Sequence, residues 1–138
     1  MRVAAGVIAD MLAHAREEAP RECCGLLIGT SDAIERSVRA RNLADRATRY
    51  LIDPEDHFAA IHAARKEGHE VVGAYHSHPS GPPVPSDTDR AEANSGADFV
   101  YVIVSLMDED VRAYRAENGM LVPQSLEATT EQAYRRRL

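Results

Sequence analysis

The spacing of apolar residues predicts three helices along the chain. An apolar stripe at helical spacing begins near the N-terminus and is broken by Pro20, where we expect the first helix to end. Pro54 suits the first position of a second helix, with Asp53 as its N-cap and Gly68 as its stop. Ser86 then precedes a short third helix. The predicted helices cover residues 2–18, 54–68 and 87–95.

Shorter apolar runs and alternating patterns predict the strands. The run CCGLLIG is almost continuously apolar, which is typical of a buried strand, and the alternating segment after it is expected to pair with it. Asn118-Gly119 is typical of a tight hairpin turn between two later strands. The predicted strands cover residues 23–29, 33–41, 50–52, 70–78, 98–106, 111–116 and 120–126.

This order of elements predicts an α/β (α+β, mixed) fold, in which helices pack on a single mixed β-sheet. The length of 138 residues and the 44% apolar content suit one domain over residues 1–138, with a loosely held tail at 128–138. The net charge of −6 argues against nucleic acid as a partner, because an acidic surface repels phosphates.

The cellular setting is inferred from three further features. No run approaches the roughly 20 apolar residues of a membrane span, so we expect no membrane association. Asp10 and His14 interrupt the N-terminal apolar stretch, which excludes a signal peptide. Cys23 and Cys24 are adjacent, a spacing that rarely forms a disulfide, and we expect them to be core residues. A cytoplasmic location is the prediction.

The candidate chemistry lies around the fourth long strand and the helix that follows it. His76 and His78 are two residues apart in a strand, so both imidazoles point to one face. An irregular loop, Pro79–Pro85, reverses the chain and leads to Ser86 and Asp89. Two histidines and one carboxylate would form an open zinc site of the catalytic kind, with a fourth position for water.

Simpler explanations exist for each of these residues. A pair of histidines at this spacing rarely binds metal by itself, and Ser86 with Asp89 also fits a helix-capping arrangement. A glutamate in the position of Glu22, after Pro-Arg, is usually a solvated turn residue. The remaining histidines are expected to face solvent: His14, His57, His62 and His69.

The combined spacing is more specific than its parts. The pattern His-x-His, seven residues, Ser, two residues, Asp resembles the signature of the JAMM (MPN+) zinc metallopeptidases, which also requires an upstream glutamate that Glu22 fits. The resemblance covers most of residues 1–127. Further similar segments are PRECCGLLIG, Tyr50–Pro54, Gly73–Tyr75 and the apolar strand at 99–106.

The resemblance implies a cytidine-deaminase-like JAMM/MPN fold and a role for each site residue. His76, His78 and Asp89 would bind one Zn²⁺ per chain together with a catalytic water. Glu22 would act as the general acid/base, and Ser86 would stabilise the oxyanion of the transition state. Such a site would activate water at neutral pH and exchange its proton through a carboxylate.

Members of this family cleave peptide or isopeptide bonds after the C-terminal glycine of ubiquitin-like proteins, and compact members act on sulfur-carrier proteins. The resemblance therefore implies a metallopeptidase whose partner is the C-terminal tail of such a protein. One alternative is a non-catalytic MPN scaffold that binds partner proteins. Another is a nucleobase deaminase, although the chain has no Cys-x-x-Cys pair. The sequence leaves the oligomeric state open, including a homodimer.

Overall fold

The computed structural model describes residues 1–44, 46–93, 96 and 98–129. The strands in this part of the chain form one mixed eight-stranded sheet, in the order β7-β6-β5-β4-β2-β3-β1-β8. The elements in chain order are β1 (Arg2–Val3), α1 (Val7–Glu18), β2 (Cys24–Thr30), β3 (Ala33–Ala40), α2 (Pro54–Lys66), β4 (Glu70–His78), α3 (Asp87–Glu92), β5 (Val100–Ser105), β6 (Asp110–Glu117), β7 (Met120–Gln124) and β8 (Glu127–Ala128). The predicted mixed α/β sheet is confirmed.

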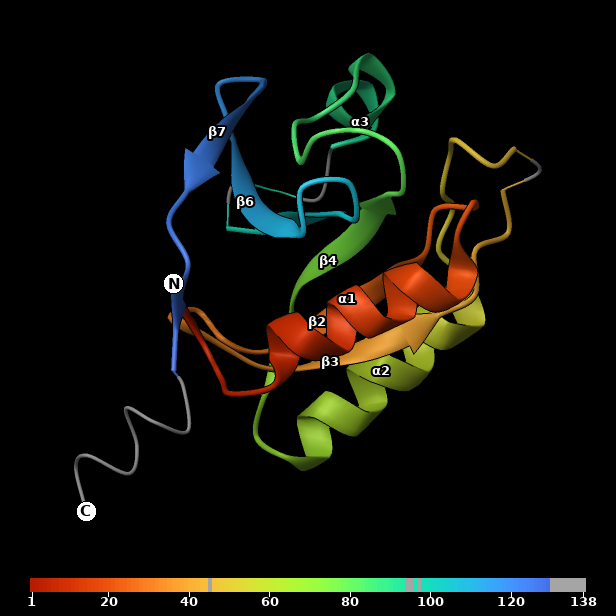
Figure 1. The fold of residues 1–138 in the computed structure, drawn as a ribbon. Helices are drawn as coiled ribbons and strands as arrows, with labels where there is room; N and C mark the ends of the chain where they lie inside the picture. The colour runs from red at the N-terminus through yellow and green to blue at the C-terminus, as the bar shows by residue number, and fades with distance from the viewer. Residues whose placement is uncertain (45, 94–95, 97, 130–138) are drawn as a thin grey trace.

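Two helices cover the central strands from opposite faces (Figure 1). Met11 and Ala15 of α1 pack in one core cluster with Leu27 of β2. Ala60 of α2 belongs to a second cluster, with Leu26 from the other face of the same strand. Each fully buried leucine stabilises the fold by about 1.5–3 kcal/mol. Side chains along β2 alternate between the two faces of the sheet, and each face is covered by a helix. Both sets of side chains are therefore buried, which explains the nearly continuous apolar run.

The pairing of the central strands determines which chain ends meet. Strand β4 lies inside the sheet, antiparallel to β2 and parallel to β5. Cys24 at the start of β2 is paired with His76, and Ser105 at the end of β5 is paired with His78. The start of β2 and the ends of β4 and β5 therefore lie at the same end of the sheet.

The two predicted helix starts at Asp53 and Ser86 are confirmed. The Asp53 side chain accepts a hydrogen bond from the Glu55 backbone N–H at 2.9 Å, and Pro54 is the first helical residue. Ser86 caps α3, which ends at Glu92. The predicted helix runs three residues further, to 95, and its positions 94–95 lie outside the described residues.

The N-terminal prediction was wrong at its beginning. Arg2 and Val3 form a strand between β3 and β8 and are not helical. Helix α1 starts only at Val7, after Gly6 with a left-handed φ of 87°. The local apolar spacing suited a helix, but the backbone N–H and C=O groups of these residues form their hydrogen bonds with two distant strands instead.

Two other predicted segments also differ. Tyr50–Ile52 is not a strand, and the only pairing found there among the described residues is one bridge between Asn42 and Ile52. Ala128, assigned to the loose tail, lies in β8, and the Thr129 N–H bonds to the Val3 carbonyl at 2.8 Å. The rest of the predicted tail, 130–138, lies outside the described residues.

Burial confirms the interpretation of the cysteines and corrects that of one histidine. Cys23 and Cys24 are free and buried, and burial raises their thiol pKa values to about 11 and about 12. His14 is buried, and its Nδ1 lies 2.8 Å from the Tyr75 hydroxyl, so the prediction that it faces solvent was wrong. His62 is exposed as expected, while the remaining two, His57 and His69, are half-buried.

None of the described helices is long and apolar enough to span a membrane.

Candidate metal centre

The three ligands predicted from the sequence meet at the end of β4. The Nε2 atoms of His76 and His78 lie 3.1 Å apart. The carboxylate of Asp89, which comes from α3, spans both rings: Oδ1 is 3.1 Å from Nε2 of His76, and Oδ2 is 3.1 Å from Nε2 of His78. All three side chains are at least 87% buried. Two imidazole nitrogens and a carboxylate thus converge on one point.

The capping arrangement of α3 orients this carboxylate. The Ser86 hydroxyl accepts a hydrogen bond from the Asp89 N–H at 3.0 Å, and the Ser86 N–H donates to Oδ2 of Asp89 at 2.9 Å. This reciprocal pair is the capping box expected from the sequence. Capping and ligand geometry are therefore not alternatives, because the same hydrogen bonds that start the helix also direct Asp89 toward the histidines.

A backbone contact determines which nitrogen of His78 faces the site. Its Nδ1 lies 2.9 Å from the carbonyl oxygen of Pro82, which can only accept a hydrogen bond. Nδ1 therefore carries a proton, and Nε2 is the ring nitrogen that faces Asp89 and His76; it offers a lone pair to a cation when His78 is neutral. A lone pair beside a carboxylate and a second imidazole is a donor set that fits a divalent cation, and Zn²⁺ prefers such N and O ligands.

Glu22 completes the cluster from the start of β2. Its carboxylate and the ligand nitrogens of His76 and His78 lie within 4.8 Å of one another, as a group that could hold a metal ion. Its backbone is held on both sides, because its N–H donates to the Ala47 carbonyl at 3.0 Å and its carbonyl accepts from Nδ2 of Asn42 at 2.9 Å. Glu22 is only 8% exposed, so it is not a solvated turn residue.

Burial and nearby charges shift the pKa values of the Glu22 and Asp89 carboxyl groups in opposite directions. Burial raises the pKa of Glu22 to about 7, with the Asp89 charge adding to the shift and the His78 charge opposing it. Burial disfavours the Asp89 carboxylate too, but its hydrogen bonds with His76 and His78 outweigh this and hold its pKa well below the usual range. Burial also lowers the pKa of His76, which favours the neutral imidazole. The site therefore pairs a permanent carboxylate with one that exchanges protons near neutral pH.

One side chain at the site was not singled out as functional from the sequence. The Tyr50 ring stacks on the His76 imidazole, with ring centroids 4.3 Å apart and planes 16° apart. Its contact with His76 spans 26 positions of the chain, so no local pattern predicts it. The Tyr50 ring therefore forms one wall of the site, although Tyr50 belongs to none of the described strands.

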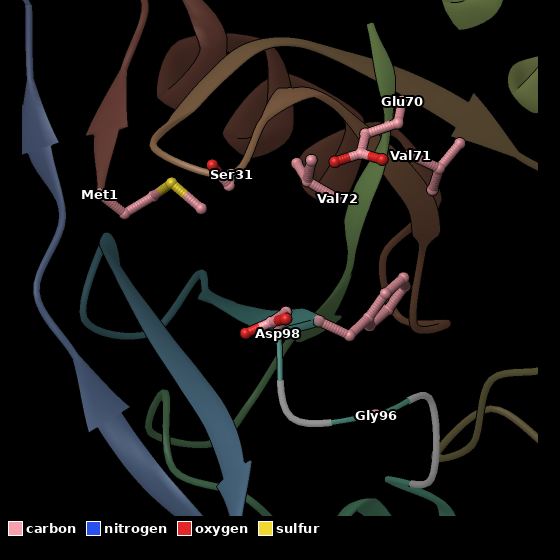
Figure 2. A pocket seen from close by; sticks show the side chains of 8 residues that line it. Met1, Ser31, Glu70, Val71, Val72, Gly96 and Asp98 are labelled. Atoms are coloured by element: carbon pink, nitrogen blue, oxygen red, sulfur yellow. The ribbon is translucent and has the colours of Figure 1, made fainter.

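The opposite end of β4 carries a separate surface pocket of about 360 Å³ (Figure 2). Glu70 and Asp98 lie on facing walls of this pocket, which also includes Met1 and Phe99. Glu70 begins β4, whereas His76 and His78 end it, so the pocket is not part of the metal cluster. Among the described residues, its lining holds no histidine or cysteine.

Comparison with known proteins identifies the family. The family model of prokaryotic homologs of the JAB domain matches residues 4–117. The chain belongs to this family. It is 41% identical to a desampylase of Haloferax volcanii over 76% of this chain and 80% of that protein. It is 36% identical to a probable TtuB-protein conjugate cleaving protease of Thermus thermophilus, over 85% and 76%. It is 34% identical to a CysO-cysteine peptidase of Mycobacterium tuberculosis, over 85% and 83%.

Solved structures of other proteins share the fold. A protein from Desulfitobacterium hafniense superposes with a TM-score of 0.86 and 29% identity, covering 95% of this chain and 94% of that one. A JAB1/MPN domain protein from Archaeoglobus fulgidus reaches a TM-score of 0.63 at 22% identity, over 94% and 96%. The predicted family and JAMM/MPN fold are confirmed, and so is the predicted enzyme class, a peptidase.

Proposed function

We propose that the chain is a zinc-dependent peptidase that hydrolyses the bond after the C-terminal glycine of a ubiquitin-like or sulfur-carrier protein. The observation that carries this proposal is the convergence of His76, His78 and Asp89 on one point, with the carboxylate of Glu22 beside it. His76, His78 and Asp89 would hold one Zn²⁺. When bound, zinc supplies a Lewis acid that makes water nucleophilic at neutral pH and polarises the scissile carbonyl.

Glu22 is assigned as the general acid/base. A carboxyl group with a pKa of about 7 both accepts and releases a proton at neutral pH, which is the optimum for such a catalyst. In this role Glu22 takes the proton of the attacking water and returns it to the nitrogen of the leaving amine. Its fixed backbone, held through Ala47 and Asn42, keeps the carboxylate directed at the site.

Ser86 is assigned as the group that stabilises the oxyanion. Its residue is exposed, and its hydroxyl accepts from the Asp89 N–H, which leaves the hydroxyl proton free to be donated to a substrate oxygen. A donor of this kind is worth about 10²–10³ in rate when it contacts the developing negative charge.

The substrate class is inferred from the relatives. Proteins 34–41% identical to this chain are named desampylase, probable TtuB-protein conjugate cleaving protease and CysO-cysteine peptidase. These names support a modifier or carrier protein as the substrate. Two kinds of reaction differ in their leaving group, which is either a single amino acid or the lysine of a second protein. The same site can perform both.

Mass spectrometry tests the proposal directly. The zinc-loaded protein is incubated with a glycine-ended carrier protein extended by one cysteine, and with the same carrier joined to a lysine side chain. Loss of the group after the glycine, abolished by a chelator and by Glu22→Gln, is expected for at least one substrate. A protein that binds zinc and both carriers without cleaving either would be a scaffold instead, and the proposed activity would be wrong.

A further inference from the structure

The loop that joins the two halves of the metal cluster has an unusual backbone. Pro79–Pro85 connects His78 to Ser86, and four of its seven residues are prolines without a backbone N–H. The loop is therefore rich in carbonyl acceptors and poor in donors. Carbonyls that are shielded from water need donors from elsewhere in the molecule.

Three consecutive carbonyl oxygens of this loop each bond to a side chain from a different strand. The Ser105 hydroxyl donates to the Gly81 carbonyl at 2.7 Å. His78 donates through Nδ1 to the Pro82 carbonyl at 2.9 Å. The Tyr114 hydroxyl donates to the Pro83 carbonyl at 2.6 Å.

The two hydroxyl donors are themselves rigidly placed by the sheet. Ser105 is fully buried at the end of β5, where it is paired with His78, and its oxygen also accepts from the Asp108 N–H at 3.1 Å. Tyr114 is 8% exposed in β6, and its bond to Pro83 is buried. If either hydroxyl turned away, the loop carbonyl would lose the side-chain partner that the described residues provide.

We propose that Ser105 and Tyr114 are positioning residues of the metal centre. They hold the proline-rich loop on the sheet so that Asp89, carried by α3 after the loop, meets the histidines at the end of β4. The inference rests on the proposed zinc site, because it concerns the geometry of the ligands that would bind the metal. Among the described residues, the hydroxyls of Ser105 and Tyr114 have no hydrogen bond to a ligand atom; they act through the carbonyls of Gly81 and Pro83.

Zinc affinity, and not activity alone, tests this role. Zinc is titrated into the metal-free protein in competition with a chromogenic chelator, for wild type, Tyr114→Phe and Ser105→Ala. Partners that orient metal ligands typically change metal affinity 10–100-fold, so we expect each variant to bind zinc about tenfold more weakly. The Co²⁺-loaded variants should also show an altered visible absorption spectrum, which reports the ligand geometry.

Tyr75→Phe is the matched control. It also removes one buried tyrosine hydroxyl with a hydrogen bond, but that bond goes to His14 of α1 and not to the loop. We expect Tyr75→Phe to lower the melting temperature while zinc affinity stays within twofold of wild type. If Tyr114→Phe and Ser105→Ala bind zinc as tightly as wild type, or if Tyr75→Phe weakens binding equally, the positioning role is wrong. A wild-type protein that binds no zinc would instead overturn the proposed function, and this inference with it.

Discussion

Glu22, two residues before β2, and His78, the last residue of the antiparallel strand β4, lie in one cluster. Cys24 is paired with His76, and the Ser77 N–H donates to the Cys23 carbonyl at 3.1 Å, so the register continued by one more residue brings Glu22 level with His78. Residues 56 positions apart in the chain are thereby brought into one cluster. The pairing of β2 with β4 thus decides where the proposed general base stands relative to the ligands.

The first prediction concerns that base. Glu22→Gln keeps the size and hydrogen-bonding capacity of the side chain but removes its ability to exchange a proton. We expect zinc content to stay at the wild-type level, because Glu22 is not one of the three ligands, while the cleavage rate falls about 10²–10⁴-fold. Elemental analysis and the mass-spectrometric assay measure the two quantities. Cleavage at the wild-type rate would exclude Glu22 as the base.

The second prediction separates the ligand role of Asp89 from its capping role. Asp89→Asn retains an oxygen that can accept from the Ser86 N–H but loses the charge that faces the two histidines. We expect a marked loss of bound zinc with little change in helix stability. Asp87→Asn is the control, since Asp87 is an exposed carboxylate in the same helical turn. Equal zinc content in both variants would show that Asp89 is not a ligand.

The third prediction separates two functions of Ser86. Ser86→Ala removes the N-cap, which lowers the stability of the protein by about 0.5–2 kcal/mol, and also removes the proposed oxyanion donor. Ser86→Gly has no side-chain donor, and glycine at an N-cap lowers stability by only about a few tenths of a kcal/mol. We therefore expect a melting temperature near wild type for Ser86→Gly, with cleavage still about 10²-fold slower. If Ser86→Gly kept the full rate, the serine would serve only as a cap.

The fourth prediction is a pH effect from His14, which is far from the metal cluster in sequence. Burial, together with the nearby Arg39 charge, lowers the pKa of His14 against the opposing charges of Glu18 and Glu17. The unfolded chain therefore takes up a proton below about pH 6.5 where the folded chain does not, so falling pH favours unfolding. The contribution is fully present above pH 6.5 and is lost as the pH falls through the lowered pKa.

His14→Gln tests this effect, because glutamine can still bond to the Tyr75 hydroxyl but does not titrate in this range. The difference in melting temperature between the two proteins isolates the imidazole, since they share every other titrating group. We expect wild type to lose stability relative to His14→Gln between pH 7 and pH 5. A constant difference across that range would contradict a buried neutral His14.

Local patterns were sufficient for most elements and for the ligand motif. Asp53-Pro54 and Ser86 marked two helix starts because capping uses backbone groups within three residues. The strand spacing of His76 and His78 placed both rings on one face for the same local reason. Arg2–Val3 and Tyr50–Ile52 were assigned wrongly because their conformations follow from contacts with distant strands and with the Asn42 region.

The sequence by itself determined most of the elements, the family and the residue types expected at the metal centre. Each of these follows from spacing within a few residues or from the motif as a whole. Only the tertiary structure decided that His14 is buried against Tyr75, that Tyr50 stacks on His76, and how the proline-rich loop is held. The tertiary structure also buries Glu22, and this burial raises its pKa to about 7. The physical reason is that burial and pairing depend on segments that are distant in the chain.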